Sequence, residues 1–211
     1  LGILEHTGSS SLSVMTQSDR AKQAAWLPQV REIAWGLSVR DLIGLGRLPF
    51  GPIQKNDMHV EAAIIKMELN AFSDRIATQL SGGEQARALI ARALAQDTPI
   101  LMADEPTASL DPANQISTLK IFSELAQAGR GIIASIHDLG LAARYCTKLA
   151  LLDRGKLVAF GSADAVLTPD NLRTVFSIEA HYEKTKEGII FQPLSVLKNN
   201  NKNFAQGDTL K

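Results

Sequence analysis

The sequence has one cysteine, few aromatic residues (5%) and no excess of charge, because its 22 lysines and arginines balance its 22 aspartates and glutamates. One cysteine excludes an intramolecular disulfide and a cysteine metal cluster and is typical of a reducing compartment, so we expect Cys146 to pack against a helix. Balanced charge gives no reason to expect a nucleic-acid partner. The sequence also lacks a signal peptide and any run of 18 uncharged apolar residues, so it predicts no membrane-spanning helix.

Apolar residues make up 45% of the 211 residues, which is enough for one domain with an aliphatic α/β core. Short apolar segments alternate with amphipathic helical ones, a pattern typical of a mainly parallel sheet with helices on both faces. The predicted strands are 24–27, 100–103, 131–136, 148–152 and 157–160. The predicted helices are 39–48, 58–69, 82–95, 112–128, 139–145 and 163–167.

The two ends of the sequence are predicted to be irregular. Residues 1–23 are rich in Ser and Thr and predict loops with an irregular strand, and the polar segment 198–211 predicts a disordered tail. Because the first residue is Leu rather than Met, we expect the sequence to be a fragment or to have a processed end. The last two predicted strands are joined by Asp153-Arg154-Gly155, which favours an antiparallel hairpin at the sheet edge.

Two glycines, Gly82 and Gly83, follow Ser81 at the predicted start of the helix 82–95. Ser81 alone is a good N-cap, but a cap does not require glycines, which weaken the first helical turn. Glycines are expected where backbone N–H groups must come close to a phosphate, with the helix dipole adding attraction. The segment, followed directly by Glu84, therefore predicts a phosphate contact.

Two adjacent carboxylates, Asp104 and Glu105, end the predicted strand 100–103. Carboxylates at the carboxyl end of a parallel strand lie where ligands bind in such sheets. Asp104 suits Mg²⁺, directly or through water, and Glu105 suits the orientation and deprotonation of a water that attacks a terminal phosphate. The structural alternative is a solvated acidic turn before Pro106.

His137 follows the predicted strand 131–136 and is expected at the same sheet edge as the carboxylate pair. The interval between residues 104 and 137 fits one strand–helix–strand unit. An imidazole at this edge can hydrogen-bond a γ-phosphate, although a single His is more often a packed or surface residue. Asp111, which precedes Pro112, has a sufficient structural role as a helix N-cap.

These segments occur in the order of the motifs of an ATP-binding-cassette (ABC) ATPase, which the sequence resembles. The segment Leu80–Gln85 resembles the signature motif, and Pro99–Pro106 resembles the Walker B motif. By the same resemblance, Ser109 and Asp111 belong to the D-loop, which communicates across an ATPase dimer, and His137 is the switch histidine.

The resemblance also makes Gln29, after Trp26-Leu27-Pro28, the Q-loop glutamine, which contacts Mg²⁺ or the lytic water and senses the membrane partner. It implies ATP and Mg²⁺ as cofactors, with Asp104 and Gln29 at the metal. It implies a P-loop NTPase-like (RecA-like) α/β fold, in which residues 1–197 form a partial ATPase domain and about 36–96 a helical signature subdomain.

A homodimer is implied as well. In that dimer Glu105 and His137 are catalytic within their own subunit. The signature contacts the ATP of the partner subunit through Ser81, Gly82, Gly83 and Glu84.

Within the family, Val39–Arg47 and Ser135–Leu139 resemble segments of importers of iron–siderophore, haem and cobalamin complexes. This resemblance implies an ATPase subunit that powers uptake of an iron complex or a related metal chelate. Its partners would be integral-membrane permease subunits and a periplasmic or extracellular substrate-binding protein. It would lie at the cytoplasmic face of the cell (inner) membrane as a peripheral subunit.

One family motif is absent, because the 211 residues contain no Gly-x-x-x-x-Gly-Lys-[Ser/Thr] phosphate-binding (Walker A) loop. We expect that loop, its strand and the N-terminal β-lobe to lie upstream of Leu1. The glycine segments 44–47 and 129–131 lack the Lys-[Ser/Thr] and do not replace it.

Two alternatives stay open. The first is a truncated, non-catalytic cassette that binds a permease or a complete ATPase. The second is a soluble ABC ATPase of DNA repair or translation, against which neutral charge and the lack of coiled-coil heptads weigh.

Overall fold

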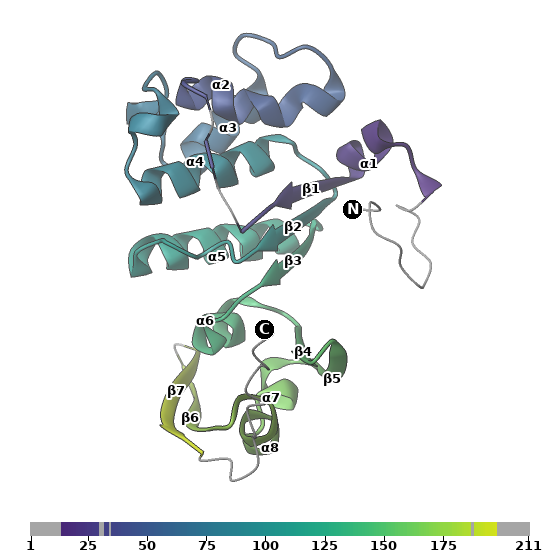
Figure 1. The fold of residues 1–211 in the computed structure, drawn as a ribbon, viewed down its shortest axis with the longest axis vertical. Helices are drawn as coiled ribbons and strands as arrows, with labels where there is room; N and C mark the ends of the chain where they lie inside the picture. Colours follow the sequence, from purple (N-terminus) through teal and green to yellow (C-terminus); the bar gives the residue numbers. More distant parts are fainter. Residues whose placement is uncertain (1–13, 30–31, 34, 187, 198–211) are drawn as a thin grey trace, which may run out of the picture. The chain divides into compact units, whose positions relative to one another are not determined.

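The computed structural model describes residues 14–29, 32–33, 35–186 and 188–197 and divides into two compact units, Leu1–His137 and Asp138–Lys211 (Figure 1). The predicted tail 198–211 lies outside the described residues, as does the first part of the segment 1–23. In the described part of the chain, no helix combines the length and the apolar character needed to cross a bilayer.

The first unit is built on a three-stranded parallel sheet. β1 (Ala24–Leu27), β2 (Ile100–Asp104) and β3 (Gly131–Ser135) lie in that order, with Ala24 opposite Ile100 and Ile100 opposite Gly131. This alignment brings the three carboxyl ends to one edge of the sheet. The predicted parallel sheet is therefore confirmed, and each predicted strand in it ends within one residue of the observed one.

One face of this sheet is buried. Leu27 and Leu101 are each 1% exposed and join a hydrophobic cluster with side chains of α4 (Gly82–Ala95). On the other face, Trp26 and Ile133 are 48% and 60% exposed. Within the first unit, the sheet is therefore packed more completely on the face that α4 covers.

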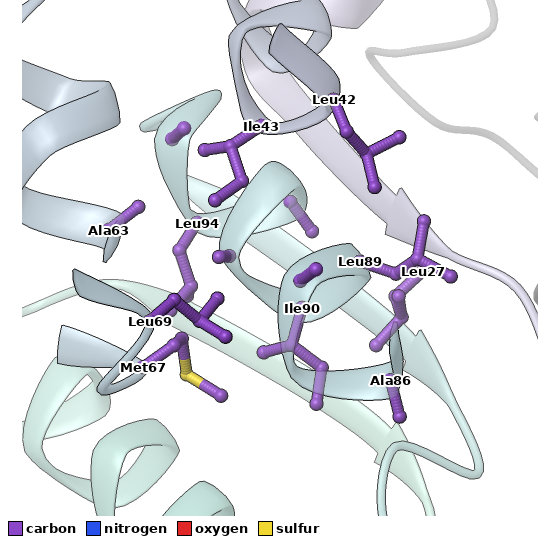
Figure 2. Close-up of a cluster of buried hydrophobic side chains, with 14 of the residues drawn as sticks. Leu27, Leu42, Ile43, Ala63, Met67, Leu69, Ala86, Leu89, Ile90 and Leu94 are labelled. Carbon is purple, nitrogen blue, oxygen red and sulfur yellow. The ribbon is translucent and has the colours of Figure 1, made fainter. Parts of the chain in front are cut away.

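The chain between β1 and β2 forms helices that pack on one another. The helices of this unit that follow β1 are α2 (Val39–Gly44), η2 (Leu45–Phe50), α3 (Met58–Lys66), η3 (Asn70–Phe72), η4 (Ala77–Gln79), α4 and, after β2, α5 (Pro112–Gln127). Figure 2 shows the core shared by α2, α3 and α4, in which Ile43, Leu69 and Ile90 are completely buried. The predicted helix 58–69 ends earlier, at Lys66, because Glu68 has a left-handed φ of 54°.

The predicted helix 39–48 changes character after Gly44. It continues as the 3₁₀ helix η2, which contains Pro49. Gly46 of η2 lies against α4, so that a Cβ atom at this position would be only 2.2 Å from the carbonyl oxygen of Arg92. A close backbone approach therefore requires glycine here, which agrees with the rejection of this segment as a phosphate-binding loop.

Replacing Gly46 by alanine is expected to lower the free energy of unfolding by roughly 2–3 kcal/mol, because η2 or α4 must shift to relieve the contact. Urea denaturation followed by circular dichroism measures the change. Gly82→Ala is the matched control, since a Cβ at residue 82 meets nothing within 4 Å and alanine favours the helix. Equal stability of the two variants would contradict the close approach.

The helix α1 (Gln17–Gln23) corrects the prediction of loops and an irregular strand for residues 1–23. Thr16 caps α1, because its Oγ1 accepts a hydrogen bond from the N–H of Asp19 at 3.1 Å. The helix buries none of its residues. Its sequence therefore shows no helical spacing of apolar residues from which the helix could be predicted. The helix is stabilised locally, by its N-cap.

The second unit contains two antiparallel hairpins and short helices. Its elements are α6 (Leu139–Tyr145), β4 (Leu149–Asp153), β5 (Lys156–Gly161), α7 (Ala163–Val166), α8 (Pro169–Asn171), η5 (Leu172–Phe176), β6 (Ile178–Thr185) and β7 (Gly188–Val196). The predicted hairpin is confirmed as β4 and β5, and its turn residues Arg154 and Gly155 have φ values of 48° and 77°. Among the described strands, however, β4 pairs with β5 alone and does not extend the parallel sheet.

The hairpin of β6 and β7 is absent from the sequence prediction, which takes β4 and β5 as the last strands. Pro193 lies within β7 opposite Ala180, next to a shift of register between Glu179 and Ala180. A proline inside an apolar segment argues against a strand unless it sits at an edge or a bulge. The prediction is wrong here because the bulge that accommodates this proline cannot be read from the sequence.

Cys146 directly follows α6 as its C-cap and is partly buried. Burial raises the pKa of its thiol above the usual value, so the reactive thiolate is scarce at neutral pH. This environment suits the packing role predicted for Cys146.

Candidate functional site

The three strands of the parallel sheet end at one edge, and predicted site residues follow each of them. Asp104 is the last residue of β2, and Glu105 comes directly after it. His137 lies two residues beyond the end of β3, and the exposed Gln29 lies two residues beyond the end of β1. Parallel topology alone thus delivers the four side chains to the same edge of the sheet.

Glu105 and His137 contact each other at this edge. Nε2 of His137 lies 2.6 Å from Oε1 of Glu105. The Glu105 side chain is 21% exposed and the His137 side chain 84% exposed, so the pair is open to solvent on the side of the histidine. Glu105 also has a φ of 46°, in the left-handed region that residues with a Cβ rarely adopt. Backbone strain of this kind clusters at functional sites.

Ser135, which is not among the site residues predicted from the sequence, joins the two carboxylate residues. Its hydroxyl donates a hydrogen bond to Oδ1 of Asp104 at 2.6 Å and accepts one from the N–H of Glu105 at 2.9 Å. A signal exists in the sequence, because Ser135 is the one residue of β3 with a polar side chain. The register that sets it opposite Asp104 appears only in the structure.

The segment of Ser81, Gly82 and Gly83 begins α4 with a capping box. Oγ of Ser81 accepts from the N–H of Glu84 at 3.4 Å, and Oε2 of Glu84 accepts from the N–H of Ser81 at 2.8 Å. Hydrogen bonds from the Ser81 backbone and hydroxyl lower the pKa of the Glu84 carboxyl. The box accounts for Ser81 and Glu84 but not for the glycines, because a Cβ at residue 82 or 83 would meet nothing within 4 Å.

The turn between β2 and α5 contains Ser109, with a φ of 64°, and Asp111. Asp111 is exposed and caps α5, because its Oδ1 accepts a hydrogen bond from the N–H of Asn114 at 2.9 Å. The backbone and side-chain hydrogen bonds from Asn114 lower the pKa of Asp111. The predicted N-cap is therefore confirmed.

The start of α4 and the sheet edge form two separate groups within the chain. Among the residues that the structure describes, no hydrogen bond or ion pair joins Ser81, Gly82 or Gly83 to Asp104 or His137. The structure thus brings Asp104, Glu105 and His137 together and leaves the glycines of α4 facing open space.

The donors at the sheet edge have the chemistry that Mg²⁺ prefers. Asp104 offers a carboxylate and Gln29 an amide oxygen, and Mg²⁺ takes oxygen ligands. In the described ranges there is no group of three or more His, Cys, Asp or Glu side chains that could hold a metal. The residues present fit an ion that is bound by one or two protein oxygens and completed by water and substrate phosphates.

Comparisons with known proteins show the family to which the chain is related. A family profile described as ABC transporter matches residues 4–108. A hemin import ATP-binding protein, HmuV, of Pseudomonas putida is 39% identical over 176 residues, which cover 79% of this chain and 69% of that protein. A cobalamin import ATP-binding protein, BtuD, of Halobacterium salinarum is 40% identical over 167 residues, which cover 77% of this chain and 42% of that protein.

Solved structures are similar as well. A metal-chelate type ABC transporter in an inward-facing conformation superposes with a TM-score of 0.69 at 28% identity, over 82% of this chain and 72% of that chain. A dimeric ATP-binding cassette in a post-hydrolysis state, bound to ADP and Pi, superposes with a TM-score of 0.63 at 21% identity, over 72% and 69% of the two chains. The α/β fold with its parallel sheet is thus the fold of ATP-binding cassettes.

Proposed function

The chain belongs to the ABC transporter ATP-binding family, and from this premise we propose that it is the ATP-hydrolysing subunit of an importer. The observation that carries the proposal is the contact of Glu105 with His137 beside Asp104, at the carboxyl edge of the parallel sheet. The imported ligand is an iron complex, such as a siderophore or haem, or a related metal chelate. Relatives named for hemin and cobalamin import and a metal-chelate type transporter support this ligand class.

Each residue at the edge has a distinct role in the proposed reaction. Glu105 orients the attacking water and accepts its proton, and His137 hydrogen-bonds the γ-phosphate. Asp104 and Gln29 provide oxygen ligands for Mg²⁺, which supplies charge neutralisation at the phosphates when bound. The 2.6 Å contact between Glu105 and His137 supports a joint action on the water and the phosphate.

The signature serves the nucleotide of a second subunit in this proposal. Gly82 and Gly83 leave the N–H groups at the start of α4 open to a close approach, and the helix dipole attracts an anion there. Ser81 and Glu84 hold this helix end in shape through their capping box. Two copies therefore meet head to tail, so that each ATP lies between the edge residues of one copy and the signature of the other.

The rest of the chain supports this arrangement. Residues of about 36–96 act as a helical signature subdomain within the ATPase domain 1–197, and they hold the helices α2 to α4. The D-loop residues Ser109 and Asp111 communicate between the two copies from the turn that precedes α5. Integral-membrane permease subunits and a periplasmic or extracellular substrate-binding protein complete the importer. The ATPase works at the cytoplasmic face of the membrane.

A second candidate function is a non-catalytic cassette that binds a permease or a complete ATPase. A cassette of this kind would not need the Gly-x-x-x-x-Gly-Lys-[Ser/Thr] loop, which the 211 residues do not contain. The intact Glu105 and His137 favour an active enzyme. The two candidates differ in whether hydrolysis appears once a phosphate-binding loop is supplied.

The test compares the 211-residue chain with a completed cassette. The completed cassette is this chain fused to an N-terminal segment of a relative that carries the phosphate-binding loop. We expect the chain alone to bind MgATP very weakly without turnover, because loop amides and the loop lysine supply most of the phosphate binding. The completed cassette should bind and hydrolyse ATP.

Calorimetry measures binding, and phosphate release measures turnover. Micromolar affinity of the chain alone would overturn the assignment of phosphate binding to the loop. A completed cassette that binds MgATP without hydrolysing it would favour the non-catalytic function.

A further inference from the structure

Ser135 lies between the two carboxylate residues of the sheet edge and has no role in the function proposed above. We propose that Ser135 is a positioning residue, which fixes the metal-binding carboxylate of Asp104 relative to the base Glu105. This inference rests on the proposed roles of those two carboxylates. In this role, Ser135 sets the distance and orientation between the carboxylates of Asp104 and Glu105.

The register of the sheet places the Ser135 hydroxyl beside Asp104. The two residues are Cα partners in the parallel pair β2 and β3, so their side chains lie on the same face of the sheet. The other residues of β3 are glycine, alanine and two isoleucines, which cannot make this contact. A polar group at the neighbouring position 136 would point to the opposite face.

The hydroxyl of Ser135 has one proton, and this proton is used in a hydrogen bond to Asp104. The hydroxyl donates it to Oδ1 of Asp104 at 2.6 Å, and its lone pair accepts the N–H of Glu105 at 2.9 Å. The Ser135 hydroxyl thus has both carboxylate residues as hydrogen-bond partners. Because the proton is engaged with Asp104, Ser135 acts through the two carboxylates and not on the substrate.

The bond to the Glu105 backbone matters because that backbone is strained. Glu105 has a φ of 46°, a conformation that persists only where its surroundings hold it. Ser135 accepts from the N–H of this residue, while His137 contacts the carboxylate at its other end. Without the hydroxyl, the N–H of Glu105 loses this hydrogen bond, and the Glu105 carboxylate is no longer held at a fixed distance from Asp104. A displacement of about 1 Å in a catalytic group can lower a rate on the order of 10²-fold.

The first experiment tests the anchor in the 211-residue chain, where no ATPase activity is required. In Ser135→Ala, hydrogen exchange of the Glu105 amide should accelerate by roughly 5-fold, because the hydrogen bond that the Ser135 hydroxyl accepts from it is lost. Ser135→Thr keeps a hydroxyl on the same carbon and should exchange at the parental rate. Ser117→Ala, at an exposed serine of α5, controls for the loss of a hydroxyl elsewhere in the unit. An unchanged Glu105 amide in Ser135→Ala would overturn the inference, whatever the function of the protein.

The second experiment uses the completed cassette. Ser135→Ala should lower kcat for ATP by about 10-fold or more and raise the Mg²⁺ concentration that gives half-maximal rate, with KM for ATP little changed. Ser135→Thr should restore both, which a general loss of stability would not produce. Thermal unfolding confirms that the variants are folded.

The two proposals fail in different ways in this assay. If Glu105→Gln abolishes turnover while Ser135→Ala keeps the parental kcat and Mg²⁺ requirement, the role of Ser135 is wrong and the proposed function stands. If Glu105→Gln has no effect on turnover, the role given to Glu105 in the proposed function is wrong, and the role of Ser135 falls with it.

Discussion

Glu105→Gln in the completed cassette is expected to bind MgATP and close the dimer while losing hydrolysis. The loss should be on the order of 10²–10⁴-fold in kcat, because an amide cannot accept the proton of the attacking water. The substitution keeps the size of the side chain and leaves the backbone bond to Ser135 in place. Phosphate release measures the rate, and size-exclusion chromatography in the presence of ATP measures the closed dimer.

Glu124→Gln is the matched control for this substitution. Glu124 is an exposed residue of α5 whose carboxylate lies 4.0 Å from Lys66, and an exposed pair of this kind contributes little to stability. The control should hydrolyse ATP at the parental rate. Parental turnover in Glu105→Gln would show that another group accepts the proton.

Ser81→Arg is expected to abolish hydrolysis when both subunits carry it. The substitution places a bulky cation at the exposed start of α4, where the γ-phosphate bound by the partner subunit must approach closely. It should leave ATP binding by the subunit's own phosphate loop intact. Calorimetry with MgATP checks that binding is kept, and phosphate release checks the loss of turnover.

Mixing the two variants tests the head-to-tail arrangement. A heterodimer of Ser81→Arg with Glu105→Gln has one composite site with both defects and one with neither. If one intact site can turn over, random mixing should restore roughly a quarter of the parental rate, since half of the dimers are heterodimers with one working site. A signature that acted within its own subunit would leave one defect in every site. No gain across a range of mixing ratios, with heterodimers confirmed, would count against the arrangement.

The sequence predicts best the elements that are apolar and periodic. The helix 82–95 and the parallel strands agree with the structure, because each turns one set of regularly spaced side chains toward the core; in β3 these are the partly buried Ile132 and Ala134. Elements that depend on a local cap or a bulge instead of on burial are not predicted from the sequence. α1 buries nothing and rests on the cap of Thr16, and β7 contains Pro193 next to a bulge.

The site was predictable where topology alone decides it. Residues after the carboxyl ends of parallel strands meet at one edge, so the meeting of Asp104, Glu105 and His137 follows from the strand predictions. Ser135 could not be found in this way. Its role depends on a register of single-residue accuracy between β2 and β3, and a shift by one residue would turn its side chain to the other face of the sheet.

The left-handed backbone of Glu105 has a consequence for how this sequence can change over time. Glycine adopts such a backbone freely, whereas a residue with a Cβ is disfavoured there by about 1 kcal/mol. Selection for thermal stability alone would therefore replace Glu105 by glycine, or by asparagine, and only selection for its carboxylate opposes that replacement. A duplicated copy of this gene that has lost its function would no longer need the carboxylate, so glycine or asparagine at residue 105 would be a sign of lost activity.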